Sequence, residues 1–449
     1  MEFEWFRSAG VGLHSAEGGS LLCDPWLNDG ALLGSWFHWP PLEGSEQEAL
    51  LSTNWDAVYI THLHGDHYDR RFMSKLAKAQ PKTKVVIADY AHPWLFDSLE
   101  SIGFRGRIIR NRAYEMQEVA PGISMTAIPA DHCDPVLCGA NIPCVSSQSW
   151  GRAIDSLGLI EIDGLRIMNA NDATTVVSSL RLYSNLPPID LMLTAYAGAS
   201  PFPQSFSNLS REEKLQAAEI KATAFLEKVA RVSTLVRPQM IFPFAGQHML
   251  GGSLTPLNET RGMFPLLDSA RKLREMQDAA VFTLQPFMRV NLSEQKMDSD
   301  FYIEPPAHER VAYLEKIRES RFPYQKRDLL RVQESDHLEL LLTGMRNLAW
   351  RYEKLGKQYK KSLVVGSELG SATLNINGEK TEVLVGDSPS FECTRVMTDP
   401  RLLDAIIRKR PGYSGFTDAH MNVADGGNHL EWFREGPYNP DLTSLLFYL

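Results

Sequence analysis

The chain has few cysteines, no long apolar run and no concentrated positive charge, and each absence excludes a class of protein. Five cysteines among 449 residues are too few for a disulfide scaffold, and the odd number leaves at least one thiol unpaired. No apolar stretch approaches the roughly 18–20 residues of a membrane span, and the first residues lack the pattern of a secretory signal. We therefore expect a cytoplasmic protein without a membrane partner.

The charge balance also disfavours nucleic acid as a partner. The chain carries 55 acidic and 46 basic residues, a net charge of −9, and no block of lysine or arginine stands out. Phosphate contacts need clustered positive charge, so we expect no nucleic-acid partner. With 43% hydrophobic and 22% charged residues, the composition is that of an ordinary globular protein with a large core.

The first half of the chain alternates short strand patterns with helical ones, which predicts an α/β fold. Runs rich in β-branched and aliphatic residues predict strands at 20–24, 56–61, 82–90, 123–130, 158–170 (a hairpin turning at Asp163-Gly164), 190–198 and 239–246. Apolar residues at helical spacing predict helices at 69–79, 92–103 and 210–236, the last opening with a capping box at Ser210.

Beyond about residue 300 the pattern changes. Residues 306–357 read as mostly helical, 362–387 as a β-meander and 401–409 as a further helix. We therefore predict two domains, a catalytic domain over residues 1–300 and an α+β accessory domain over 301–449. The second offers no chemistry of its own and suits a scaffold, a lid or the contact surface of a homodimer.

The strongest chemical signal is the segment THLHGDH, residues 61–67, at the end of a predicted strand. Two histidines at positions i and i+2, His62 and His64, point to one side of an extended backbone. Asp66 and His67 follow where the chain turns into the next helix. Neutral imidazole and carboxylate are ligands of zinc, iron and manganese, so the segment predicts a metal site.

This H-x-H-x-D-H spacing resembles the metal motif of the metallo-β-lactamase superfamily. The resemblance implies an αββα sandwich and two metal ions, with a further histidine, a bridging aspartate and a last histidine after later strands. His132, Asp172 and His248 occupy suitable positions. The implied first set of ligands is His62, His64 and His132, the second is Asp66, His67 and His248, and Asp172 bridges the two ions.

A closer resemblance is to the metallo-β-lactamase-like domain of CMP-N-acetylneuraminate hydroxylase, over about residues 10–250. The similar segments are Cys23–Leu27 (CDPWL), SWFHWPP at 35–41, THLHGDH, AGASPFPQSF at 197–206 and QMIFPFAG at 239–246. Enzymes of that family hydroxylate the N-acetyl group of a sugar nucleotide, using dioxygen and electrons from a redox partner. The resemblance therefore implies oxygen chemistry at a pair of iron ions.

Two departures separate the chain from that family. A Rieske centre needs cysteine and histidine pairs spaced C-x-H and C-x-x-H. None of the five cysteines has a histidine at either spacing (Cys23, Cys133, Cys138, Cys144 and Cys393). Electrons must then come from an external donor, such as a ferredoxin or a reductase, or from the substrate. His248, which has no counterpart in the hydroxylase pattern, completes a seven-residue ligand set and puts a sialic-acid substrate in doubt.

Two chemistries fit this ligand set. The first is a non-haem di-iron oxygenase that acts with dioxygen on a small polar metabolite. The alternative is a hydrolase with zinc or manganese, in which a bridging hydroxide attacks a phosphoester, amide or lactone and Asp66 or Asp172 takes the proton. A domain that binds a ligand without turnover is a third reading. Loop residues expected at the same rim are the candidate substrate contacts: Trp26, Tyr196, Ser200, Gln204 and Gln247.

Overall fold

The computed structural model describes residues 1–90, 93–129, 156–172, 186–293, 297–326, 333–354, 357–408, 427–436, 446 and 449. The predicted ligand His132 and the cysteines Cys133, Cys138 and Cys144 lie outside these ranges. No helix within them is long and apolar enough to cross a membrane.

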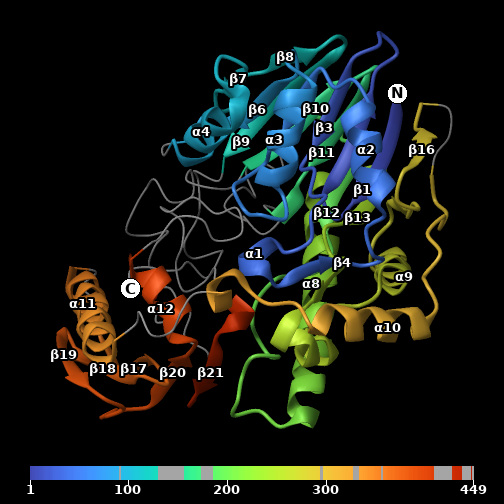
Figure 1. The fold of residues 1–449 in the computed structure, drawn as a ribbon. Helices are drawn as coiled ribbons and strands as arrows, with labels where there is room; N and C mark the ends of the chain where they lie inside the picture. The colour runs from blue at the N-terminus through green and yellow to red at the C-terminus, as the bar shows by residue number, and fades with distance from the viewer. Residues whose placement is uncertain are drawn as a thin grey trace.

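The first sheet has seven strands in the order β16-β1-β2-β3-β5-β6-β7 (Figure 1). Its strands are β1 (Glu2–Arg7), β2 (Gly10–His14), β3 (Ser20–Cys23), β5 (Ala57–Tyr59), β6 (Lys84–Ala88), β7 (Ile108–Asn111) and β16 (Met288–Asn291). β3, β5, β6 and β7 run parallel, so their carboxyl ends meet at one edge of the sheet. Loops that follow those ends are therefore brought together.

The second sheet also has seven strands, in the order β15-β13-β12-β11-β10-β9-β8. They are β8 (Gln117–Ala120), β9 (Ile123–Pro129), β10 (Ser156–Ile162), β11 (Leu165–Asn169), β12 (Leu191–Ala195), β13 (Met240–Phe244) and β15 (Ala280–Val281). β10 and β11 form the predicted hairpin, and its two turn residues have positive φ, 50° at Asp163 and 79° at Gly164. An Asp-Gly pair tolerates that conformation, which is why the sequence indicated the turn.

The two sheets pack face to face with helices outside them (Figure 1). Alternate side chains on a strand point to opposite faces, so Leu21 of β3 joins the core between the sheets while Leu22 packs against helices. Those helices are α2 (Gly44–Ser52), α3 (Arg70–Ala79) and α4 (Trp94–Leu99), the last continued by η1 (Glu100–Phe104). α8 (Arg211–Val236) and α9 (Leu266–Met276) pack on the second sheet. The expected αββα layers are confirmed.

Two short strands and two short helical segments complete the first part of the chain: α1 (Ala31–Gly34), β4 (Trp36–His38), β14 (His248–Leu250) and η4 (Gly252–Thr260). A further short helical segment, η5 (Pro323–Lys326), lies in the C-terminal part. β4 and β14 pair with each other, although more than 200 residues separate them in sequence. The sequence did not predict this pairing, which fixes the position of His248.

The C-terminal part is built on a third, five-stranded sheet in the order β19-β18-β17-β20-β21. Its strands are β17 (Tyr359–Ser367), β18 (Gly370–Gly378), β19 (Lys380–Val385), β20 (Cys393–Met397) and β21 (Glu431–Arg434). The helical segments before and around it are α10 (Ala307–Arg318), α11 (Glu334–Lys354), α12 (Pro400–Arg408) and η8 (Gly427–His429). The expected meander and helices are present, so the α+β character is confirmed, whereas the boundary near residue 300 stays a prediction.

The two parts share apolar contacts. Tyr313 and Ile317 of α10 pack on Trp39 and Met249, which belong to the first part. Phe206 lies in the C-terminal core, where its ring stacks on Trp432 at a centroid distance of 6.0 Å.

Truncation after residue 300 is expected to give insoluble protein, because it uncovers Trp39, Met249 and Phe206. Each such side chain loses roughly 1.5–3 kcal/mol of burial, and together they form an exposed apolar patch. Size-exclusion chromatography of the fragment beside the full chain measures this. A soluble, metal-loaded fragment 1–300 would contradict the expectation.

Candidate metal centre

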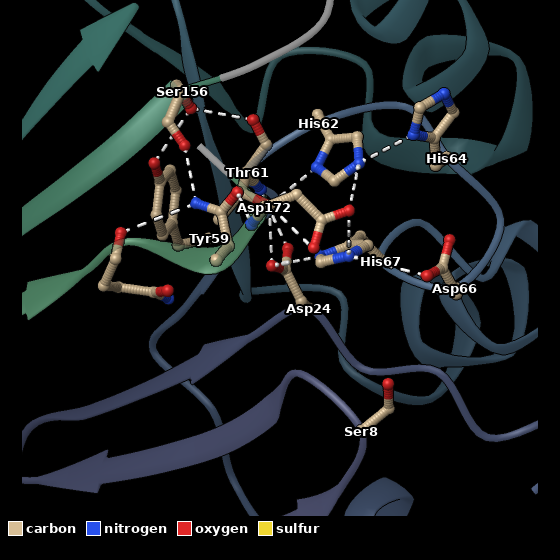
Figure 2. Close-up of polar contacts among 12 residues, drawn as sticks. Ser8, Asp24, Tyr59, Thr61, His62, His64, Asp66, His67, Ser156 and Asp172 are labelled. Carbon is tan, nitrogen blue, oxygen red and sulfur yellow. Dashed lines mark hydrogen bonds and ion pairs between the residues drawn. The ribbon is translucent and has the colours of Figure 1, made fainter. Parts of the chain in front are cut away.

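The predicted metal motif lies at the edge where the parallel strands of the first sheet end. Asp24 directly follows β3, and Thr61 and His62 follow β5. Because β3 and β5 pair in parallel, these residues become neighbours. Asp172 reaches the same place from the second sheet, three residues after β11 (Figure 2).

A buried carboxylate, Asp24, organises the loop. Its Oδ1 accepts a hydrogen bond from the Thr61 amide at 2.8 Å, and its Oδ2 accepts one from the Thr61 hydroxyl at 2.7 Å. His67 Nδ1 lies 2.9 Å from the same Oδ2, so this ring nitrogen donates to the carboxylate (Figure 2). Asp24 therefore fixes both the backbone of the motif and the orientation of His67.

These contacts also determine which nitrogen of each histidine carries the proton. The Thr61 hydroxyl gives its only proton to Asp24, so its oxygen accepts from His62 Nδ1 at 3.1 Å. His62 and His67 then both hold a proton on Nδ1, which leaves Nε2 as the nitrogen of each ring that could bind a metal ion. A histidine that ligates a metal through Nε2 characteristically donates its other nitrogen to a partner of this kind.

The Nε2 atoms converge on Asp172. Its Oδ2 lies 3.9 Å from His62 Nε2 and 3.6 Å from His67 Nε2, and one ligand atom from each residue falls within 4.8 Å of the others. Metal bonds of about 2.0–2.2 Å separate the ligands of one ion by roughly 3–3.5 Å. His67 Nε2 is buried and has no hydrogen-bond partner among the described residues. A metal ion fits this group.

The other two residues of the motif flank it. His64 Nδ1 lies 2.9 Å from His62 Nε2, and Asp66 Oδ2 lies 3.6 Å from His67 Nε2 (Figure 2). The structure thus brings together five of the seven predicted ligands: His62, His64, Asp66, His67 and Asp172. His132 lies outside the described residues.

His248 lines the same cavity as Asp66 and Asp172 but faces another group. Its Nε2 accepts a hydrogen bond from the Arg261 guanidinium at 2.8 Å, and its ring stacks on Trp36 at a centroid distance of 3.5 Å. Burial and the positive charge of Arg261 hold the pKa of His248 well below its usual value. The ring is neutral and its Nε2 lone pair is engaged, so a role as ligand requires it to turn away from Arg261.

Burial and mutual charge shift the other groups of the centre. Burial raises the pKa of Asp66 to about 6. Burial alone would lower the pKa of His67, but Asp66, Asp172 and Asp24 outweigh it and raise that pKa. In the same way, His67 outweighs burial and lowers the pKa of Asp172. The metal-free centre therefore carries protons that a metal ion must displace.

Metal retention is expected to fall as the pH drops through about 6, where Asp66 takes up a proton. A protonated carboxyl does not ligate, so protons compete with the ion. The same raised pKa makes the charged Asp66 a cost in the metal-free protein, and that cost grows as the pH rises from 3.8 to about 6 and is complete above it. Elemental analysis after dialysis at a series of pH values measures the release, with circular dichroism as the control for folding. Constant metal content from neutral pH down to about pH 5 would contradict the expectation.

A cavity of about 240 Å³ opens beside the centre. Asp66 and Asp172 form one part of its wall, and Phe225, Lys228 and Val229 of α8 form another. None of the five candidate substrate contacts is among the described residues that line it. Trp26 and Tyr196 are buried, and Gln204 donates to the carbonyl of Ser200 at 2.8 Å and to Asn428 at 2.6 Å. Gln247, next to His248, is buried as well.

Sequence reasoning missed the roles of Asp24, Thr61 and Arg261. A signal existed for Asp24, because a carboxylate that directly follows the strand beside β5 must reach the same edge of the sheet. Arg261 gave none, since its contact with His248 depends on the η4 turn between them.

Comparison with known proteins gives partial matches. No family model matches the chain. The chain is 27% identical over 257 residues to a Mycolicibacterium smegmatis protein named as a Rieske 2Fe-2S iron–sulfur protein, covering 56% of this chain and 45% of that protein. It is 24% identical over 301 residues to the cytidine monophosphate-N-acetylneuraminic acid hydroxylase of Gorilla gorilla gorilla, covering 65% and 46%. The chain thus spans about half the length of the curated relatives it matches.

Two solved structures show the same kind of partial likeness. Igni18, a metallo hydrolase from Ignicoccus hospitalis, is 16% identical with a TM-score of 0.42, covering 64% of this chain and 97% of that one. A mutant of the CmlA beta-hydroxylase is 16% identical with a TM-score of 0.42, covering 65% and 53%. Both scores are low, so the assignment depends on the chain's own layers and motif. An αββα sandwich with H-x-H-x-D-H at its rim has the metallo-β-lactamase fold, as the sequence predicted.

Proposed function

We propose that the chain is a dinuclear non-haem iron oxygenase that hydroxylates a small polar metabolite with dioxygen and an external reductant. The observation that carries this proposal is the convergence of His62, His67 and Asp172 beside His64 and Asp66. Imidazole nitrogen and carboxylate oxygen are ligands that ferrous iron accepts. The likeness to hydroxylases over about two thirds of the chain favours oxygen chemistry over hydrolysis.

In this proposal Asp172 would bridge two ions. His62 and His64 would hold the first with His132, and Asp66 and His67 would hold the second with His248. The five described residues of the centre stand close enough to share two neighbouring ions. His248 would complete the second set after leaving Arg261.

The chain's own residues prepare the centre for this chemistry. Asp24 and Thr61 hold the Nδ1 protons of His67 and His62, so Nε2 is the nitrogen of each ring that could bind an ion once it displaces the proton of His67. Asp66, with a pKa raised to about 6 by burial, can hold or release a proton near neutral pH. Bound ferrous iron supplies electrons for the reduction of dioxygen.

Electrons would come from a separate protein such as a ferredoxin or a reductase. The described cysteines, Cys23 and Cys393, are both buried and free, and neither has a histidine at Rieske spacing. Burial raises the pKa of both thiols. They are suited to packing and not to holding an iron–sulfur cluster.

Protein from cells supplied with iron, zinc and manganese is expected to contain about two irons per chain. Anaerobic reduction followed by addition of oxygenated buffer should then consume dioxygen, and an electrode measures this. The His64→Ala variant is the control, because it lacks a predicted ligand while His64 is only partly buried. Two zinc or manganese ions with no oxygen uptake would contradict the oxygenase.

The runner-up is a zinc- or manganese-dependent hydrolase of a phosphoester, lactone or amide. The observation that favours it is Asp66, a proton acceptor tuned to about 6 beside the predicted ions. Turnover of a phosphoester or lactone panel by the zinc- or manganese-loaded protein would establish it.

A further inference from the structure

A second cavity, of about 530 Å³, lies against the loop that carries the metal motif. It is lined by Gly65, which stands between His64 and Asp66, and by residues around α1, the start of α3 and η5. It shares none of its lining residues with the cavity beside the metal centre. Two carboxylates and four basic side chains line it: Asp29, Asp69, Arg70, Arg71, Arg321 and Lys326.

Both carboxylates are already engaged. Asp69 caps α3, where its Oδ1 accepts from the amides of Arg71 and Phe72 at 3.1 and 3.0 Å. Its Oδ2 accepts from the amide of Leu27 at 3.0 Å and from the side chain of Asn28 at 2.7 Å. Asp29 Oδ1 accepts from the backbone amide of His38 and contacts its ring Nδ1, each at 2.8 Å. These acids are committed to holding the backbone.

The basic side chains are not neutralised in this way. All four are exposed, and no ion pair joins any of them to a carboxylate in the described part of the chain. Arg71 donates to the backbone carbonyl of Asp29, and Arg70 donates to the Ser101 hydroxyl at 3.1 Å. Four positive charges therefore stand against two carboxylates, which leaves the hollow with a net positive charge.

We propose that this second cavity binds a small polyanion through its phosphate groups. Guanidinium groups present pairs of N–H donors that match phosphate oxygens, and such charge-assisted bonds are stronger than neutral ones. The volume lies within the range of small-molecule sites. A hollow of this kind favours a small ligand over the acidic surface of a protein partner. The inference does not depend on which chemistry the metal centre performs.

The test is a calorimetric titration of the full-length, metal-loaded protein with inorganic pyrophosphate. We expect saturable binding that weakens as salt is added. The double variant Arg321→Gln, Lys326→Gln should weaken it about tenfold or more, because each substitution removes a charged donor. Lys78→Gln on the same helix as Arg71, which lies outside the cavity lining, is the matched control and should bind as the parent does.

Exposure of Arg321 and Lys326 keeps the double variant foldable, which thermal unfolding and metal analysis check. Equal binding by the parent and the double variant would overturn the proposal. So would the absence of binding up to about 10 mM pyrophosphate, which would leave an acidic protein as the occupant. Loss of binding in Asp172→Asn with retention in the double variant would place pyrophosphate on the metal and also overturn it.

Discussion

Replacement of Asp172 by alanine is expected to leave the chain folded and to remove most of its bound metal. The Asp172 carboxylate stands within 4 Å of the Nε2 atoms of both His62 and His67, and it is the only described group that joins them from the second sheet. If it bridges two ions, its loss weakens both sites. We expect the content to fall from about two ions per chain to below about one.

The reason for expecting a folded variant is the position of the side chain. The Asp172 side chain is 41% exposed, and its backbone amide keeps its hydrogen bond to Asn171 Oδ1 at 2.6 Å. Removal of the carboxylate therefore keeps the backbone contact that holds this position. The cost falls on the metal, because an ion held mainly by neutral imidazoles loses its compensating negative charge.

Elemental analysis of the purified variant measures the effect, with Asp278→Ala as the matched control. Asp278 is an exposed aspartate beyond α9, remote from the motif in the fold, and its replacement should leave metal content unchanged. His64→Ala should reduce the content by about one ion, since it removes one ligand of a single site. Full metal content in Asp172→Ala would refute the assignment of this residue.

The metal motif could be predicted because its residues are consecutive. His62, His64, Asp66 and His67 stand within six positions, and a strand end followed by a turn brings their side chains to one place. Asp172 could be predicted only through the resemblance to the metallo-β-lactamase motif, which implies an aspartate after a later strand. Local backbone geometry was enough for the four consecutive residues, and the resemblance supplied the fifth.

The groups that complete the site depend on contacts that no local pattern encodes. Asp24 meets His67 across 43 residues through the parallel pairing of β3 with β5. His248 is placed by the pairing of β14 with β4, and the Arg261 contact then engages its Nε2. The candidate substrate residues were chosen by their loops, but tertiary packing decides which side chains reach a cavity.

The elements themselves followed the sequence where a strong local signal existed. Ser210 and Glu213 form the predicted capping box, and α8 runs from Arg211 to Val236 as expected. The interval 306–357 was less informative. Its apolar spacing indicated a mostly helical segment without its internal breaks, and the structure has two separate helices, α10 and α11, with η5 between them. Pro323 opens η5, and a proline there favours a new start.

Asp24→Asn is expected to weaken metal binding by about ten- to a hundredfold while keeping the side chain's size. The asparagine retains one oxygen, but its amide nitrogen replaces one carboxylate oxygen and can only donate. Asp24 Oδ1 accepts from the Thr61 amide, and Oδ2 accepts from both the Thr61 hydroxyl and His67 Nδ1. The donors that face the new amide nitrogen therefore lose their acceptor. If His67 loses it, the ring is free to move its proton to Nε2, where the proton competes with the metal.

The matched control is Asp69→Asn, a second buried carboxylate that accepts several hydrogen bonds. Asp69 accepts four, from Leu27, Asn28, Arg71 and Phe72, but contacts no predicted ligand. Both variants should lose roughly 1–3 kcal/mol of stability, because each leaves a buried donor poorly satisfied. Thermal unfolding measures that loss, and competition with a chelator measures metal affinity. If metal affinity falls only in Asp24→Asn, the loss comes from the orientation of His67 and not from general destabilisation. Equal metal affinity in the two variants would assign Asp24 a purely structural role.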